Sequence, residues 1–146
     1  MKVEFQIFQT ASISDVLNNI CEYIRANYNH SKKLAVLAPQ GIAKELDNKL
    51  WQADTESFLP HFCAINSKQY NSHADIPVLI TDNMFILSGV DELINLMDIV
   101  IDSSKVKVAK LTEIVYQADK ALESSRKKYM FYKKAGFEIK SNKINP

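Results

Sequence analysis

The sequence predicts an α/β fold in which a mostly parallel, or mixed, central sheet lies between two layers of helices. Short apolar runs alternate along the chain with longer segments of helical periodicity, which is the order of elements in a layered α/β domain. The run at residues 34–38 is apolar throughout, as expected for a parallel strand covered on both faces. At 146 residues the chain has the length of one domain with one sizeable core. We therefore expect a single Rossmann-like α/β/α domain over residues 1–146, without a nucleotide site.

The first half of the chain contains the clearest helix and strand patterns. Residues 3–7 alternate apolar with polar side chains, which is typical of a strand. Ser12 and Asp15 have the spacing of a capping box, and apolar residues follow at every fourth position to residue 28. Pro39 stands where a helix tolerates proline, near its first turn. The predicted elements are a strand at 3–7, helices at 12–28 and 39–52, and strands at 34–38 and 62–65.

The second half ends in a long helix that Gly136 closes, since glycine is common just past a helix C-terminus. Residues 66–75 are polar and predict a loop. The interval 103–112 alternates Val106 and Val108 with lysines and receives no assignment. The predicted elements are a strand at 77–81, a short strand or turn at 85–87, a helix at 90–96, strands at 98–102 and 113–116, and a helix at 119–134.

Several function classes lack support in the sequence. The three glycines form no phosphate-binding motif, and the three histidines lack metal-ligand spacing. Aspartates near strand ends are more typical of solvated turns than of catalysis. No apolar run is long enough to span a membrane, and the N-terminus is unlike a signal peptide. We expect a cytoplasmic protein without catalytic residues, cofactor or metal.

The charge is unevenly distributed along the chain. The net charge is +1, but residues 1–119 hold 10 Lys and Arg against 15 Asp and Glu, whereas residues 120–146 hold 8 against 2. A basic end on a near-neutral protein indicates an anionic partner. A phosphate backbone and an acidic peptide both fit this description, and solubility alone is a third explanation.

Two groups of side chains are candidates for binding. Trp51, Phe58, Pro60 and His61 lie close together in sequence at a helix–loop junction, where they either plug the core edge or form a binding surface. Arg126 and Tyr129 share one face of the last helix. Taken alone, that helix is a solvated basic helix packed by its tyrosines. Together the groups predict an apolar pocket with a guanidinium at its rim.

Such a pocket suits a short peptide with an apolar terminal side chain and a free carboxylate. The side chain would enter the pocket, and the carboxylate would accept two hydrogen bonds from the arginine fork. Single-stranded nucleic acid is the alternative ligand, because aromatic and basic groups also bind stacked bases and phosphates. Against this alternative, the basic residues are concentrated near the C-terminus and the rest of the chain is net acidic.

Two separated motifs resemble the chi subunit of bacterial DNA polymerase III. They are Leu46-Asp47-x-x-Leu50-Trp51 with Glu56-Ser57-Phe58-Leu59-Pro60-His61, and Arg126-x-x-Tyr129-x-x-Tyr132-Lys133-x-Ala135-Gly136-Phe137. The resemblance implies a non-catalytic subunit with an α/β/α fold and no working nucleotide site. It further implies a one-to-one pairing with the psi subunit, an indirect link to the clamp loader, and binding of the acidic, phenylalanine-ended C-terminal tail of single-stranded DNA-binding protein. DNA would be contacted only indirectly.

The resemblance also assigns a peptide site residue by residue. Trp51, Phe58, Val115, Arg126 and Tyr129 match the family's pocket, with Arg126 as the carboxylate partner. Lys128 would add to a basic rim, and Pro60 and His61 would shape the wall, although His61 is equally typical of a structural histidine. Leu122 and Met130 stand at positions that are usually basic, so the electrostatic part of binding is expected to be weaker or differently placed.

Overall fold

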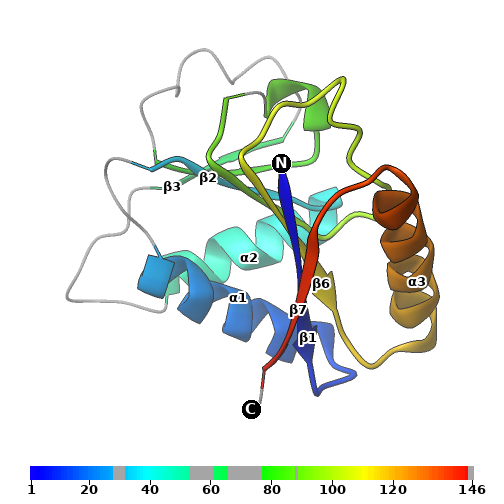
Figure 1. Cartoon of the computed structure of the whole chain (residues 1–146). Helices are drawn as coiled ribbons and strands as arrows, with labels where there is room; N and C mark the ends of the chain where they lie inside the picture. Colours follow the sequence, from blue (N-terminus) through cyan, green and yellow to red (C-terminus); the bar gives the residue numbers. More distant parts are fainter. Residues whose placement is uncertain (28–31, 53–60, 66–76, 88, 145–146) are drawn as a thin grey trace.

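A seven-stranded, entirely parallel sheet forms the centre of the computed structural model, which describes residues 1–27, 32–52, 61–65, 77–87 and 89–144 (Figure 1). The strand order is β3-β4-β2-β5-β6-β1-β7. The strands are β1 (Lys2–Phe8), β2 (Leu34–Leu37), β3 (His61–Ala64), β4 (Val78–Thr81), β5 (Glu92–Asn95), β6 (Lys110–Val115) and β7 (Ile139–Ile144). The helices are α1 (Ile13–Asn27), α2 (Gln40–Gln52) and α3 (Asp119–Lys134), with a short 3-10 helix, η2 (Met84–Ile86).

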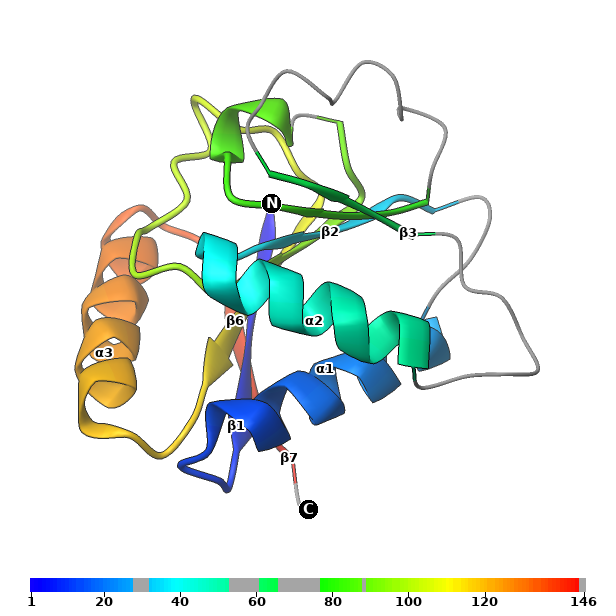
Figure 2. The same ribbon diagram turned by 180° about the vertical axis from the view of Figure 1, so that it is seen from behind.

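The helices cover both faces of the sheet, which confirms the predicted three-layer architecture. Helices α1 and α2 lie side by side on one face, and α3 lies on the other (Figures 1 and 2). Successive strand residues point to opposite faces, so the core has two halves. Val36 and Ile94 belong to the half beneath α1 and α2, whereas Leu37 and Leu93 belong to the half on the α3 side.

The two long helices α1 and α3 form close to their predicted positions. Ser12 caps α1, because its hydroxyl accepts a hydrogen bond from the Asp15 backbone N–H at 3.4 Å. Val16, Ile20 and Ile24 follow one another at four-residue intervals, so all three lie on the helix face that packs into the core. Helix α3 has the predicted bounds, and the φ of +86° at Gly136 lets the chain turn back toward the sheet. None of the helices among the described residues is both long and apolar enough to span a membrane.

Two predicted elements between β4 and β6 are wrong. The predicted helix at 90–96 contains strand β5, which is buried at all four positions between β2 and β6. A short apolar run buried on both faces cannot be distinguished from a buried helix by periodicity. The predicted strand at 98–102 is irregular instead. Its Ile101 is buried by packing on the α3 side, and its backbone N–H donates to the Tyr132 hydroxyl at 2.9 Å.

Strand β7 is a further difference from the prediction. Its sequence is mostly polar and its middle residues are exposed, so it has little of the apolar pattern that marks a buried strand. It pairs with β1, where Phe5 lies opposite Ser141. Strand β6 begins at Lys110, within the interval that the sequence left unassigned. The predicted loop at 66–75 lies outside the described residues.

Candidate functional site

A solvent-open groove runs between α3 and the β6-β1-β7 end of the sheet, and we call it the α3 groove. It encloses about 470 Å³. Strands supply its floor and one rim, and α3 supplies the opposite wall. Its lining residues are Phe5, Ile7, Val115, Leu122, Ser125, Arg126, Tyr129, Met130 and Ser141.

The floor of the α3 groove is apolar and held in place by packing. Phe5 and Val115 come from the neighbouring strands β1 and β6 and are only 3% and 8% exposed. The Tyr129 ring packs edge-on against Phe5, with ring centroids 5.8 Å apart. This geometry is favourable for aromatic pairs and fixes the wall against the floor. An aromatic or aliphatic side chain can therefore enter the groove without displacing a charged group from its floor.

The rim of the groove carries an arginine that is available to a ligand. Arg126 is exposed, and it forms no ion pair or hydrogen bond with any residue that the structure describes. Its neighbours differ in this respect, since Lys127 pairs with Glu123 at 3.6 Å and Lys133 lies 6.0 Å from the centre of the Tyr129 ring. A guanidinium fork can donate two parallel hydrogen bonds to one carboxylate. The groove thus combines an apolar floor with a carboxylate-binding group.

Lys128 does not belong to the rim, which corrects the sequence prediction. Its ammonium group is buried under α3, where it donates to Glu113 Oε1 at 3.0 Å and to the Met97 carbonyl. Glu113 also accepts hydrogen bonds from the Tyr132 hydroxyl at 2.6 Å and from the Asn95 side chain at 3.0 Å. Burial raises the pKa of Glu113, and the nearby Lys128 opposes that rise. This network attaches α3 to the sheet and so positions the groove wall.

The structure separates Trp51 and His61 from the α3 groove. Trp51 lies in the last turn of α2, and α2 lies on the opposite face and toward the opposite edge of the sheet from α3 (Figures 1 and 2). Its ring lies 4.5 Å from that of His61, whose Nε2 is 3.2 Å from Asp47 Oδ1. A single pocket containing both Trp51 and Arg126 is therefore wrong. Phe58 and Pro60 lie outside the described residues.

The sheet also brings two connections together where open α/β sheets commonly bind ligands. Neighbouring strands β1 and β6 lead to α1 and α3 on opposite faces, which is the topological switch point of the sheet. Gln117 bridges this position. Its backbone N–H donates to the Thr10 carbonyl at 2.7 Å, and its side-chain amide donates to the Phe8 carbonyl at 3.0 Å. Among the described residues, no group of three or more His, Cys, Asp and Glu side chains is arranged to hold a metal ion.

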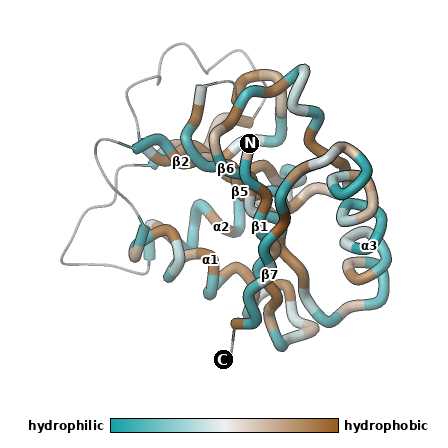
Figure 3. Tube along the Cα trace, in the orientation of Figure 1, coloured by the Kyte–Doolittle hydropathy of each residue, from teal (hydrophilic) through white to brown (hydrophobic). Residues whose placement is uncertain are grey.

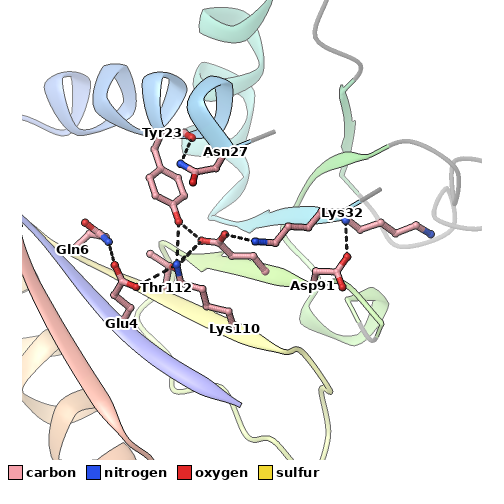
Figure 4. A network of polar contacts seen from close by, with 10 residues as sticks. Glu4, Gln6, Tyr23, Asn27, Lys32, Asp91, Lys110 and Thr112 are labelled. Atoms are coloured by element: carbon pink, nitrogen blue, oxygen red, sulfur yellow. Dashed lines mark hydrogen bonds and ion pairs between the residues drawn. The ribbon is translucent and has the colours of Figure 1, made fainter. Parts of the chain in front are cut away.

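A second buried carboxylate lies at the opposite ends of the strands and has a structural role. Glu92 Oε2 accepts hydrogen bonds from Thr112 at 2.8 Å and from Tyr23 at 2.5 Å. Figure 4 shows Tyr23, Lys110 and Glu4 of this polar network. Lys110 lies 3.2 Å from Glu4 and 3.9 Å from Glu92. Burial, together with the hydrogen bond to Glu92, raises the pKa of Tyr23 to about 12. These groups satisfy one another and attach α1 to β5 and β6.

The comparisons with known proteins decide the family. The sequence model of the family described as DNA polymerase III chi subunit, HolC, matches residues 1–140. The chain belongs to the DNA polymerase III chi subunit family. Membership of this family supports the role of an accessory subunit of DNA polymerase III in DNA replication. Such a role is consistent with a protein that is not an enzyme. No curated protein sequence matches the chain significantly.

This chi-family chain resembles solved structures of DEAD-box proteins in its fold. The C-terminal domain of a variant of S. cerevisiae Dbp5, bound to a Gle1 variant and IP6, is 11% identical with a TM-score of 0.68, and the match covers 97% of this chain and 90% of that one. E. coli DEAD-box protein SrmB, bound to regulator of ribonuclease activity A, is 10% identical with a TM-score of 0.58, and 99% and 92% of the two chains are covered. At these identities the likeness shows the fold alone.

Sequence reasoning missed part of the groove in this chi-family chain. Val115, Arg126 and Tyr129 were predicted site residues, and the structure brings all three together. Phe5 and Ile7 were predicted only as strand residues, yet they form the floor. Lys128 had an available signal, because it lies four residues before the buried Tyr132 and so shares its helix face. No sequence signal pointed to Ser141, because strand β7 was not predicted.

Proposed function

We propose that this chi-family chain is a non-catalytic adaptor that binds the acidic C-terminal tail of single-stranded DNA-binding protein in the α3 groove. It would link the clamp-loader assembly of DNA polymerase III, with a psi subunit as its one-to-one partner, to coated single-stranded DNA in the cytoplasm. Contact with DNA would be indirect. The phenylalanine ring at the end of the tail would enter the groove, and the terminal carboxylate would pair with Arg126.

The observation that carries this proposal is the exposed Arg126 at the rim of an apolar groove. Phe5 and Val115 present a floor without charge, which suits an aromatic side chain that is removed from water on binding. The guanidinium fork of an arginine can bind the C-terminal carboxylate of a peptide through two hydrogen bonds. A ligand that ends in an aromatic residue supplies both groups at adjacent positions.

The charge around the groove supports an acidic ligand. Exposed lysines on α3 and β7 surround Arg126, and such a field raises the association rate of acidic partners in a salt-dependent way. The exposed lysines are Lys120, Lys127, Lys133, Lys134 and Lys143. Only Glu123 and Glu138 oppose them within residues 120–146.

The residues of the proposed site differ in part from those that the sequence predicted. Val115, Arg126 and Tyr129 stay in it, and Phe5, Ile7 and Ser141 join it. Lys128 serves the fold through Glu113 and does not contact the ligand. Trp51 and His61 lie elsewhere, while the roles predicted for Phe58 and Pro60 stay sequence predictions.

A fluorescent peptide that is acidic, ends in Pro-Phe and has a free carboxylate tests the proposal. Its anisotropy is titrated against wild type, Arg126→Ala and the control Lys134→Ala, which removes an exposed cation of the same helix outside the groove. We expect salt-sensitive binding that Arg126→Ala weakens at least about tenfold and Lys134→Ala changes less than about threefold, because only Arg126 makes charge-assisted hydrogen bonds.

Two results would overturn the proposal. Equal losses in both variants would mean that the peptide senses only the general positive charge. Binding to a single-stranded oligonucleotide that competes with the peptide and persists without the carboxylate would instead favour direct nucleic-acid binding. A peptide amidated at its C-terminus distinguishes these cases, because the proposal expects it to bind wild type as weakly as the free acid binds Arg126→Ala.

A further inference from the structure

The outer edge of β7 is an open strand edge beside the α3 groove. Strand β7 ends the sheet and, among the described strands, pairs with β1 alone. No described element lies beyond it in Figure 1 or Figure 3. Residues 140–143 are exposed. An open edge of this kind is a template for pairing with another extended chain.

The register of β7 shows which of its backbone groups face outward. Val3 lies opposite Ile139, and its N–H donates to the Glu138 carbonyl at 3.4 Å. In a parallel ladder, alternate residues of a strand direct both their N–H and C=O groups to the same side. The backbone groups of residues 138, 140 and 142 therefore face β1. Ser141 and Lys143 direct their backbone groups to the open edge.

The same strand forms one rim of the α3 groove. Ser141 lines the groove together with Arg126, and it lies opposite Phe5 of the groove floor. The helix wall runs from Leu122 to Met130, which corresponds to about 12 Å at the helical rise. That length equals about three to four residues of extended chain. A short extended segment paired along β7 would therefore span the length of the groove.

We propose that an acidic peptide with a free C-terminal carboxylate binds this chain by adding a strand to the open edge of β7. This inference rests on the proposed function and specifies how the peptide backbone is held. The terminal carboxylate pairs with Arg126, and the preceding residues exchange hydrogen bonds with the backbone of Ser141. Strand addition of this type takes affinity from main-chain hydrogen bonds and specificity from neighbouring pockets.

The positive charge of the β7 edge favours an acidic peptide over a second copy of this chain. Lys140 and Lys143 are exposed on opposite faces of β7, so acidic residues of an added strand meet a lysine on either side. A second copy of this chain is disfavoured at the same edge, because two copies of β7 would bring these lysines together. Lysines on an edge strand are a common means of preventing such self-association.

The test removes one outward N–H without disturbing the ladder to β1. Ser141→Pro deletes the N–H that faces the open edge, and proline is tolerated at edge positions of this type. Ser141→Ala is the matched control, because it changes the side chain and retains the N–H. We expect Ser141→Pro to bind the fluorescent acidic peptide about fivefold or more weakly than Ser141→Ala, because only the proline variant lacks the outward N–H.

Peptides methylated at single backbone nitrogens provide a second measurement that does not depend on the folding of a variant. Against wild type, methylation at one of the two positions before the phenylalanine is expected to reduce affinity about as much as Ser141→Pro. If every methylated peptide and Ser141→Pro bind like their controls while Arg126→Ala still fails, the strand addition is wrong and the proposed function stands. If wild type binds no peptide, both fail. A dimer that the peptide dissociates would assign the edge to a second copy and also overturn the inference.

Discussion

The α3 groove and the contact between Trp51 and His61 contain similar side chains, but their basic residues face different surroundings. In the groove, Arg126 is exposed at the rim of an apolar floor. Near the end of α2, the side chain of His61 on β3 is buried beside the Trp51 ring, and its Nε2 already lies 3.2 Å from Asp47 Oδ1. An aromatic residue near a basic one is thus a binding group in one place and an internal contact in the other.

The two regions also differ in how they are attached to the sheet. Helix α3 rests on a buried polar network in which Lys128 and Tyr132 both bind Glu113. Helix α2 packs on the sheet through apolar residues such as Leu46 and Leu50. The groove wall therefore depends on a few satisfied polar groups, which are costly to leave without partners in a low-dielectric interior. This contrast can be tested by experiment.

The largest effect is expected from Lys128→Met. The change leaves the Glu113 carboxylate buried without its cation, so we expect the free energy of unfolding to fall by about 3–5 kcal/mol. Chemical denaturation followed by circular dichroism measures the loss. The emission of Trp51, the only tryptophan, reports on the other region and should be unchanged in the native baseline. A loss below about 1 kcal/mol would mean that the pair does not support α3.

The defect of Lys128→Met should also depend on pH. Burial raises the pKa of Glu113 above its ordinary value of 4.5, and loss of Lys128 removes the main opposing influence. A carboxyl with a raised folded-state pKa favours the folded state in acid, and this contribution is lost as the pH rises above its ordinary value. The stability difference from wild type should therefore shrink when the pH falls from 7 toward 4.5. A difference that grows in acid would contradict this account.

Tyr132→Phe is expected to have an intermediate effect. The Tyr132 hydroxyl donates to Glu113 and accepts from the Ile101 backbone N–H at 2.9 Å, so its removal leaves two buried polar groups short of a partner. We expect a loss of about 1–3 kcal/mol in unfolding free energy. Tyr116→Phe is a suitable control, because Tyr116 belongs to the α1–α2 side of the core. Equal losses in the two variants would argue against a special role for the network.

These differences explain which parts of the molecule could be predicted from the sequence. Helix α3 has long apolar and basic patterns with a glycine at its end, and its predicted bounds are correct. Strand β5 was predicted as a helix because four buried residues carry no period. The groove could be predicted only in part, since Arg126 and Tyr129 share a helix face whereas Phe5 reaches them only through the strand order. Trp51 was misplaced because closeness of residue types says nothing about which face of the sheet they occupy.

The smallest effect is expected from adding charge to the groove. Met130 lines the groove and is 53% exposed, at a position where the family resemblance implies a basic residue. Met130→Lys should tighten peptide binding by about 0.2–1 kcal/mol, and the gain should disappear at high salt. Anisotropy titrations at two salt concentrations measure it, with Met130→Gln as the uncharged control. A gain that persists at high salt would have a cause other than charge.

The affinities of Arg126→Ala and Trp51→Ala for the same acidic, phenylalanine-ended peptide test the separation of the two regions most directly. Both variants remove a large exposed side chain, since Arg126 is exposed and Trp51 is 54% exposed. The account predicts that Arg126→Ala loses at least about tenfold in affinity, because a charge-assisted pair is removed, while Trp51→Ala binds like wild type. A comparable loss in Trp51→Ala, with the protein folded, would contradict the assignment of the ligand to the α3 groove alone.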